Sequence, residues 1–424
     1  MAHYQRRGSI PPKRHTVHRR PDGAIVYEEL MGEDGFSSDS SLLYHERPPS
    51  AILDARTWAL PGQAVSPNHP LLPRHLRLHK LVEGEEWKRL DAVTGRRVLL
   101  ANPDVAISYV ACGETSPLYR NAIGDECVYV ESGSASFESV FGGFEVGAGD
   151  YVVVPRGTTH RWIPSSDVPL RAYCIEAAGH ISPPRRYLSP KGQFLEHAPY
   201  CERDLRLPGD PPRGSGGELG VEVYVKHRTL PGAPPIGASA AGAPGAAGAA
   251  GAGLGVAGTV HLAANHPFDV VGWDGCNYPY AFNVSDFEPI TGRVHQPPPV
   301  HQVFEASNFV VCNFVPRKVD YHPRAVPVPY YHSNVDSDEV MFYCGGNYAA
   351  RAGSGISLGS LSLHPAGFPH GPQPAAYESS PGTEQVDELA VMIDTFRPLG
   401  IGEGGLAVED PSYAWSWAGG ARTS

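Results

Sequence analysis

The chain has 424 residues and a formal net charge of −11, from 45 acidic and 34 basic side chains. This acidic balance, without a basic stripe interleaved with aromatic residues, argues against a nucleic-acid partner, and no strongly apolar run is long enough for a membrane span. With 48 Gly and 42 Pro, the sequence favours short strands joined by turns. We therefore expect an all-β architecture of about two or three domains.

The N-terminal segment is basic, and the cysteines are scattered. Arg and Lys are frequent up to Arg20, but no apolar segment follows them, so we interpret this stretch as a solvated or subunit-contacting arm and not as a secretion signal. The seven cysteines never form a CxxC pair, which argues against a disulfide framework and against a zinc ribbon. We expect a cytoplasmic protein with reduced thiols.

The first half of the chain contains a pattern of turn residues and possible ligands. The segment Tyr119-Arg-Asn121 is followed by Glu126 and Gly133, and then by Gly149-Asp-Tyr-Val-Val-Val-Pro155-Arg-Gly157-Thr-Thr-His160. The second segment has the form G-x5-P-x-G-x2-H. Gly and Pro there predict a tight turn after one strand, and the His begins the next strand, pointing into a barrel.

A low-complexity stretch lies between the two halves. From about Gly232 to Gly258 the sequence is almost entirely Ala, Gly and Pro. Such a composition buries too little apolar surface to offset its ordering entropy. We predict that residues 232–258 form a mobile surface insertion without a chemical role.

The second half repeats the pattern of the first. His332-Ser-Asn334 is followed by Glu339 and Gly346, and then by Gly359-Ser-Leu-Ser-Leu-His-Pro365-Ala-Gly367-Phe-Pro-His370. In both copies Asn and Glu are five residues apart, and Glu and Gly are seven apart. The repeat predicts two related small β-barrels, a bicupin of jelly-roll type with few short helices.

The second copy contains a possible metal site. His332, Glu339 and His370 supply two imidazoles and one carboxylate, the facial set that leaves positions open for substrate and O2. Asp338 stands beside Glu339 and is an alternative ligand, although the register of the repeat favours Glu339. In the first copy Tyr119 takes the position of His332, so we predict that this barrel has lost its metal and acts as a scaffold.

Two further histidines are candidates for the same cavity. His295 lies in the segment Gly292-Arg-Val-His-Gln-Pro-Pro-Pro, which is too proline-rich for a helix. This segment could hold the imidazole of His295 over the cavity, where it would act as a general base near neutral pH. His364 precedes His370 by six residues and could support the metal ligands by hydrogen bonding.

The sequence resembles the homogentisate 1,2-dioxygenase family, especially its bacterial branch. The matching segments are Glu33-Asp-Gly-Phe-Ser-Ser-Asp-Ser-Ser-Leu-Leu-Tyr-His45, Asn265-His-Pro-Phe-Asp-Val-Val-Gly-Trp-Asp274, Tyr330-Tyr-His-Ser-Asn-Val-Asp-Ser-Asp-Glu339 and His370-Gly-Pro. The likeness covers nearly the whole chain apart from the Ala/Gly-rich insertion.

The resemblance implies an iron enzyme. Its expected reaction is the opening of homogentisate by O2 to maleylacetoacetate, in tyrosine and phenylalanine breakdown. Fe(II) would be held by His332, Glu339 and His370, and His295 would deprotonate the substrate. The resemblance also implies a β-rich N-terminal domain (1–285), a smaller catalytic domain (286–424) and assembly into trimers or hexamers.

The chain departs from the eukaryotic members of this family at two places. The interval from His332 to the carboxylate is one residue longer, which keeps Asp338 as an alternative. An Arg found on the strand after the Glu ligand is absent, so any role in holding the substrate carboxylate would pass to Tyr348, Tyr330 or Arg324. As substrate-binding residues we expect Tyr348, His370, His364 and Tyr331. The alternatives are a dioxygenase for another hydroxylated aromatic acid, such as gentisate, and a zinc or manganese sugar-phosphate isomerase. A non-catalytic storage or binding bicupin is a third, but it predicts the loss of both metal sites, and only one is lost here.

Overall fold

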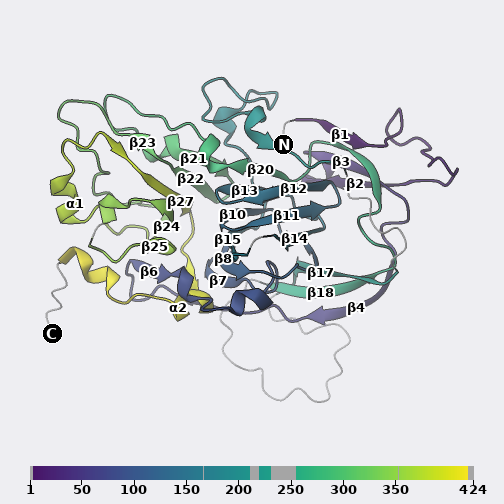
Figure 1. Cartoon of the computed structure of the whole chain (residues 1–424), viewed down its shortest axis with the longest axis horizontal. Helices are drawn as coiled ribbons and strands as arrows, with labels where there is room; N and C mark the ends of the chain where they lie inside the picture. Colours follow the sequence, from purple (N-terminus) through teal and green to yellow (C-terminus); the bar gives the residue numbers. More distant parts are fainter. Residues whose placement is uncertain (1–2, 166, 211–218, 231–254, 352, 419–424) are drawn as a thin grey trace, which may run out of the picture.

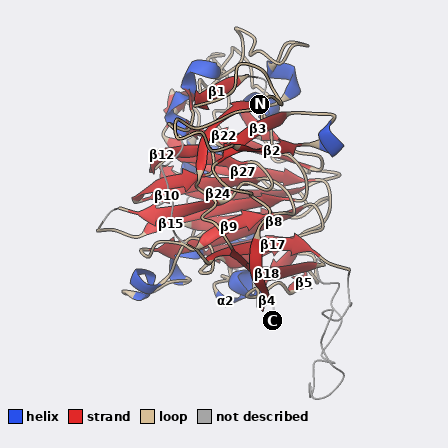
Figure 2. Ribbon diagram, turned by 90° about the vertical axis from the view of Figure 1, so that its right-hand side faces the viewer, coloured by secondary structure: helices blue, strands red, loops and turns tan. Residues whose placement is uncertain are grey.

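The computed structural model describes residues 3–165, 167–210, 219–230, 255–351 and 353–418. Strands dominate these ranges (Figure 2). α-Helix is limited there to short segments such as α1 (Pro374–Ser379) and α2 (Glu403–Ala407), and no helix in the described ranges is long and apolar enough to cross a membrane. The predicted all-β fold is confirmed.

The first barrel consists of two large sheets. One has nine strands in the order β16-β20-β13-β10-β15-β8-β7-β28-β5, and the other has seven in the order β12-β11-β14-β9-β17-β18-β4. Nearly all pairings are antiparallel. The strands of the nine-stranded sheet are β5 (Val65–Pro67), β7 (Arg97–Ala101), β8 (Val105–Cys112), β10 (Glu126–Ser132), β13 (Asp150–Val154), β15 (Leu170–Ala177), β16 (Leu205–Arg206), β20 (Tyr280–Asn283) and β28 (Gly400–Gly402). Those of the seven-stranded sheet are β4 (Ile52–Trp58), β9 (Leu118–Asn121), β11 (Ser134–Ser139), β12 (Gly142–Gly147), β14 (His160–Pro164), β17 (Val221–Arg228) and β18 (Val256–Ala263).

The second barrel has one large sheet and one small one. Its six-stranded sheet runs β21-β22-β27-β24-β25-β6, and a two-stranded ribbon pairs β23 with β26. The sheet lies beside the first barrel, at the opposite end of the molecule from β17 and β18 (Figure 1). The strands are β6 (Arg74–Arg77), β21 (Gln302–Glu305), β22 (Phe309–Phe314), β24 (Asp338–Gly346), β25 (Ser360–His364) and β27 (Glu388–Thr395), with β23 (Arg317–Lys318) and β26 (Gln385–Val386) in the ribbon.

Successive side chains of the central strands point alternately into two different apolar layers. On β10, Cys127 and Tyr129 face the core shared with the second barrel, whereas Val128 and Val130 face the interior of the first barrel. On β24, Phe342 faces the shared core. This two-residue period is what a strand buried on both faces requires. The nine-stranded and six-stranded sheets therefore pack face to face over one continuous core.

The two barrels differ in what fills them. The interior of the first is closed by apolar side chains, including Phe137 and Trp162. In the second, the inner face of β24 and β27 carries Met341, Tyr343 and Met392, which line a cavity of about 150 Å³. Because a two-stranded ribbon replaces most of a second sheet, the second barrel has room for a small ligand.

Strands are exchanged between the halves of the chain. β6 pairs with β25 in the six-stranded sheet, and β28 pairs with β5 and β7 in the nine-stranded sheet. The division into domains at residues 285 and 286 stays a prediction. Residues 231–254, which hold most of the predicted insertion, lie outside the described ranges, and β18 begins at Val256.

A four-stranded sheet, ordered β1-β19-β3-β2, contains a buried ion cluster at its edge. It is built from β1 (Gln5–Gly8), β2 (Tyr27–Gly32), β3 (Ser40–His45) and β19 (Val270–Gly275). The His45 ring contacts Asp269 through Nδ1 at 2.7 Å and Glu29 through Nε2 at 3.0 Å. Burial alone would lower the pKa of His45, but its hydrogen bonds to the two carboxylates raise it to about 9.

This cluster predicts a pH-dependent contribution to stability. Because the pKa of His45 is higher in the folded than in the unfolded chain, its contribution is complete below the ordinary value of about 6.5 and is lost as pH rises towards 9. The free energy of unfolding of the wild type should fall over this window more steeply than that of the His45→Gln variant. Urea unfolding at several pH values measures the difference, and parallel curves would refute it.

Candidate metal centre

The carboxylate that faces the two histidines is that of Glu339. Asp338 is turned the other way: Oδ1 accepts a hydrogen bond from the backbone N–H of Ala366 at 2.8 Å, and Oδ2 accepts one from Leu399 at 2.8 Å. Successive residues of a strand point to opposite sides, so the start of β24 can present only one of the two acids. Asp338 secures the turn before His370, and Glu339 is left as the candidate ligand.

The first barrel has the same construction, which confirms the internal repeat. Asp125 accepts hydrogen bonds from the backbone N–H groups of Arg156 at 2.8 Å and Ile181 at 2.9 Å, as Asp338 does in the second barrel. His160 pairs with Tyr119 across β14 and β9, and His370 pairs with His332 in a matching β-bridge. The alignment of Tyr119 with His332, predicted from spacing, is thus observed in three dimensions.

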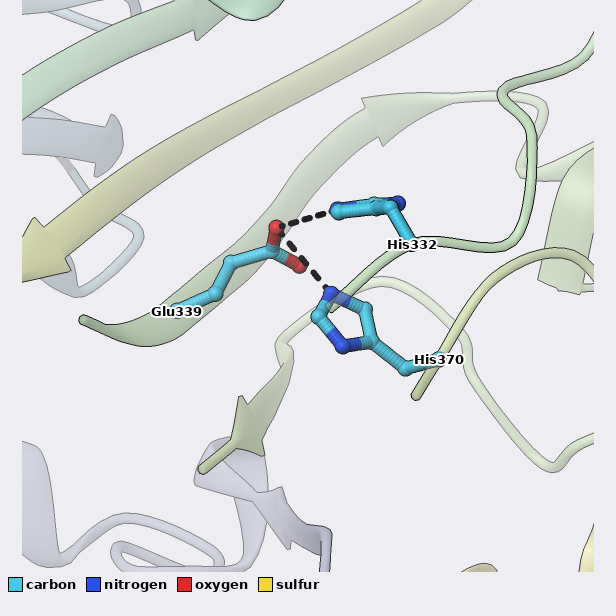
Figure 3. A group of neighbouring side chains, drawn as sticks. All are labelled: His332, Glu339 and His370. Atoms are coloured by element: carbon cyan, nitrogen blue, oxygen red, sulfur yellow. Dashed lines mark ion pairs between the residues drawn. The ribbon is translucent and has the colours of Figure 1, made fainter. Parts of the chain in front are cut away.

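Three side chains from separate segments converge on one point (Figure 3). His332 comes from the loop before β24, Glu339 from β24, and His370 from the loop after β25. Glu339 Oε2 lies 3.5 Å from His332 Nε2 and 3.3 Å from His370 Nε2. One ligand atom from each residue therefore lies within 4.8 Å of the others, as a single metal ion requires. Glu339 and His370 are buried, and His332 is partly exposed.

Backbone carbonyls fix the tautomers of both imidazoles. His332 Nδ1–H donates to the carbonyl of Tyr330 at 3.1 Å, and His370 Nδ1–H donates to that of Phe368 at 3.1 Å. Each Nε2 then carries a free lone pair directed at the centre, the arrangement typical of metal-binding histidines. His370 Nε2 is buried and has no hydrogen-bond partner in the described structure. These donors fit a divalent metal ion.

Glu339 is held by a third histidine. His364 Nδ1 lies 3.1 Å from Glu339 Oε1, and His364 Nε2 lies 3.0 Å from the hydroxyl of Tyr413. Burial lowers the pKa of His364 to about 3, so the ring is neutral. It donates a hydrogen bond to the carboxylate and accepts one from the tyrosine. Burial alone would raise the pKa of Glu339, but its interactions with the three surrounding imidazoles hold the pKa well below its ordinary value.

Removing this support should weaken metal binding without removing a ligand. We expect His364→Gln to lower the affinity for the metal about 10- to 100-fold, as is usual for groups that orient a ligand. Tyr413→Phe, which removes only the hydroxyl behind His364, should have a smaller effect. Competition with a chelator measures both affinities, and unchanged binding in the His364 variant would show that Glu339 needs no such support.

A cavity in front of the triad contains the predicted base. His295 lines it together with His332 and Glu339. His295 Nδ1 lies 3.2 Å from Asp320 Oδ2, and the ring packs edge-on against Tyr330 at 4.8 Å between ring centroids. Asp320 also lines the cavity. A carboxylate on Nδ1 orients the imidazole and leaves the Nε2 lone pair of His295 available to accept a proton.

The other predicted substrate contacts lie elsewhere. His364 stands behind Glu339, as described above. The Tyr348 ring packs against Tyr343 at 5.0 Å between centroids, and the half-exposed Tyr331 ring lies 6.1 Å from that of Tyr377. Neither Tyr348 nor Tyr331 is among the residues that line the cavity. Their contact with substrate stays a prediction.

Sequence reasoning missed several charged residues of the cavity, among them Asp320 and Arg351. Asp320 is 25 positions from the histidine that it orients, and no motif links them. Arg351 ends the short 3-10 helix η8 (Ala349–Arg351) and lies between the two matched segments of the second copy, where the repeat has no fixed residue. From the sequence, the only signal for Asp320 or Arg351 is that a charged residue lies within a few tens of positions of a predicted site residue.

In the first barrel a guanidinium stands where the metal would be. Arg96 donates to Glu126 at 3.1 Å and to Glu176 at 3.0 Å, and the hydroxyl of Tyr119 donates to the other oxygen of Glu126 at 3.0 Å. Burial alone would raise the pKa of Glu126, but chiefly the charge of Arg96 lowers it to about 2. The buried His160 remains as the third member, its Nε2 without a hydrogen-bond partner in the described structure. This geometry supports the prediction that the first barrel is a scaffold.

The two barrels and the two-histidine, one-carboxylate group in the second barrel place this protein among the cupins with a candidate metal site. Comparison with known proteins narrows the class. Residues 107–176 match the cupin domain, and residues 288–422 match the family described as homogentisate 1,2-dioxygenase C-terminal.

Curated relatives match over almost their whole length. A Saccharolobus solfataricus protein, provisionally named a dioxygenase, is 38% identical over 98% of this chain and 99% of its own. Homogentisate 1,2-dioxygenases of Emericella nidulans and Rhodopseudomonas palustris (strain BisA53) are 25% and 26% identical, over 94% and 97% of this chain and 87% and 90% of theirs. The chain belongs to the homogentisate 1,2-dioxygenase family and is therefore an enzyme of the dioxygenase type.

Proposed function

We propose that the protein is an Fe(II)-dependent homogentisate 1,2-dioxygenase, which uses O2 to open the ring of homogentisate and yields maleylacetoacetate. The observation that carries this proposal is the convergence of His332, Glu339 and His370 on one point at a cavity of about 150 Å³. Two imidazoles and one carboxylate on one side leave other positions free, as O2-activating iron sites require. The reaction would belong to the breakdown of tyrosine and phenylalanine.

Iron fits the donor set. Neutral imidazoles and a carboxylate suit Fe(II). The cysteines Cys312 and Cys344 are buried in the apolar layers of the sheet, and neither belongs to the group of possible ligands. Bound in such a centre, Fe(II) supplies electron transfer to O2 and open positions for an aromatic hydroxyl.

The protein groups around the centre divide the remaining work. His295 takes the proton of a ring hydroxyl, and Asp320 holds its imidazole in position. Met341 and Met392 supply an apolar wall to the cavity, which excludes water and packs against an aromatic ring. Glu339 stays ionised among the three imidazoles that surround it, and His364 donates a hydrogen bond to it.

Oxygen uptake tests the substrate. Protein loaded with Fe(II) should consume O2 with homogentisate and much more slowly with gentisate, which carries its carboxylate directly on the ring. A spectrum of the ring-opened product identifies the bond that breaks. Iron-dependent uptake with gentisate and not with homogentisate would reject the proposed substrate and favour the alternative dioxygenase.

Metal analysis separates the proposal from a zinc or manganese isomerase. An isomerase would bind these metals and turn over a sugar phosphate without O2. Assembly into trimers or hexamers and a cytoplasmic location remain predictions. Light scattering of the purified protein tests the first of them.

A further inference from the structure

Arg351 is a buried cation at the cavity. Among the described residues no carboxylate lies within ion-pair distance of its side chain, and the charge of Glu339 acts on it only from farther away. Its side chain is buried and lines the cavity with His332 and Glu339. Among the ion pairs of the described residues, none involves Arg351. By contrast, Arg317, which lines the same cavity, pairs with Glu388 at 3.3 Å, so its charge is already balanced.

The Arg351 guanidinium is held in a fixed position by neutral groups. Its Nε–H donates to the hydroxyl of Tyr343 at 3.1 Å, and one terminal nitrogen donates to the carbonyl of Gly371. The guanidinium also lies 6.0 Å from the centre of the Trp417 ring. Within the described part of the chain, the second terminal nitrogen makes no hydrogen bond. The fork is therefore oriented in advance of any ligand.

Such a group favours an anion. Burying an unpaired charge is costly, and a charged partner in the cavity would relieve part of that cost. A planar guanidinium matches a carboxylate through two parallel N–H donors. The strand after Glu339 supplies no basic residue, since it reads Tyr343-Cys-Gly-Gly-Asn. Arg351 reaches the cavity from the helix that follows.

We propose that Arg351 binds the carboxylate of the substrate and makes the enzyme specific for aromatic acids over neutral hydroquinones. The inference rests on the proposed function for the identity of the ring, but the role of Arg351 can be tested separately. Arg351 lines the same cavity as His295, His332 and Glu339, so a carboxylate bound at Arg351 would keep the hydroxyl-bearing ring within that cavity.

The test compares homogentisate with methylhydroquinone, which has the same ring and hydroxyls but no carboxylate. In the wild type kcat/KM should favour the acid. In Arg351→Met we expect kcat/KM for homogentisate to fall about 10- to 100-fold, the usual effect of losing a hydrogen-bonded charge, while the value for methylhydroquinone changes little. Arg351→Lys should keep part of the preference because it keeps the charge. Arg317→Met is the comparator: it removes a balanced cation and should alter the preference less.

The ratio of the two kcat/KM values decides the outcome. Equal losses with both compounds in Arg351→Met, or in Arg351→Lys if the Met variant does not fold, would mean that Arg351 only supports the fold of the cavity, and the inference would be wrong. If the wild type oxidises another aromatic acid instead of homogentisate, the proposed function fails. The role of Arg351 is then measured with that acid and its neutral analogue.

Discussion

Replacing His370 with alanine should abolish both iron binding and oxygen uptake. His370 supplies one of only three ligand atoms, and its Nε2 has no other partner in the described structure. We expect turnover to fall by at least about a thousandfold, since removing a group on which a catalytic unit depends costs about this much or more. Iron content by elemental analysis and O2 uptake with homogentisate measure the two effects.

The internal repeat offers a matched control for this variant. His160 occupies the same place in the first barrel, is also buried, and donates through Nδ1 to the carbonyl two residues earlier, as His370 does. His160→Ala should keep both iron and turnover per folded molecule, whatever it does to stability. Retained turnover in His370→Ala would contradict the proposed metal centre in the second barrel. Loss of iron in His160→Ala would indicate instead that the first barrel binds the metal.

Removing Arg96 should be among the most destabilising single changes in the protein. Its side chain is buried between Glu126 and Glu176. Glu176 keeps a second cation, Lys226, but Glu126 has no other in the ion pairs of the described residues. Arg96→Met would leave a buried carboxylate uncompensated, which typically costs about 3–5 kcal/mol. Urea unfolding measures this loss.

Two further variants test the cause of that loss. In Arg96→Met/Glu126→Gln the unpaired charge is gone, so part of the stability should return. Arg161→Met breaks a partly exposed pair with Glu138 and should cost less than about 1 kcal/mol. If Arg96→Met lowers the free energy of unfolding no more than Arg161→Met does, then Arg96 does not compensate the buried charge of Glu126 as a metal ion would.

The features that recur in the sequence were predictable. Both copies of the pattern place Gly, Pro and His at fixed intervals, and each Gly of the G-x5-P-x-G turns has a positive φ: 88° and 84° in the first copy, 75° and 73° in the second. Glycine adopts this conformation without steric cost. The conformation of the turn therefore requires glycine at fixed positions in the sequence. The histidine three residues after the second glycine, His370 in the second copy, could be predicted from this spacing.

The features that depend on contacts between distant segments were not predictable. Arg96 pairs with Glu126 in the first barrel although the two residues are 30 positions apart in the sequence. Strand β6 joins a sheet whose other strands all lie after residue 301. The register of the repeat favoured Glu339 over Asp338, but only the backbone partners of Asp338 show that this acid is turned away from the two histidines. Periodicity predicts which side of a strand a residue faces, but it does not predict what lies opposite.

The most direct test of the metal centre in the second barrel is a titration of metal-free protein with Fe(II) in the presence of homogentisate and air. The initial rate of oxygen uptake should rise in proportion to the added iron and reach a plateau at a single iron per chain, because Arg96 closes the site in the first barrel. A plateau at two irons per chain, uptake that does not depend on iron, or no uptake with homogentisate would contradict the account.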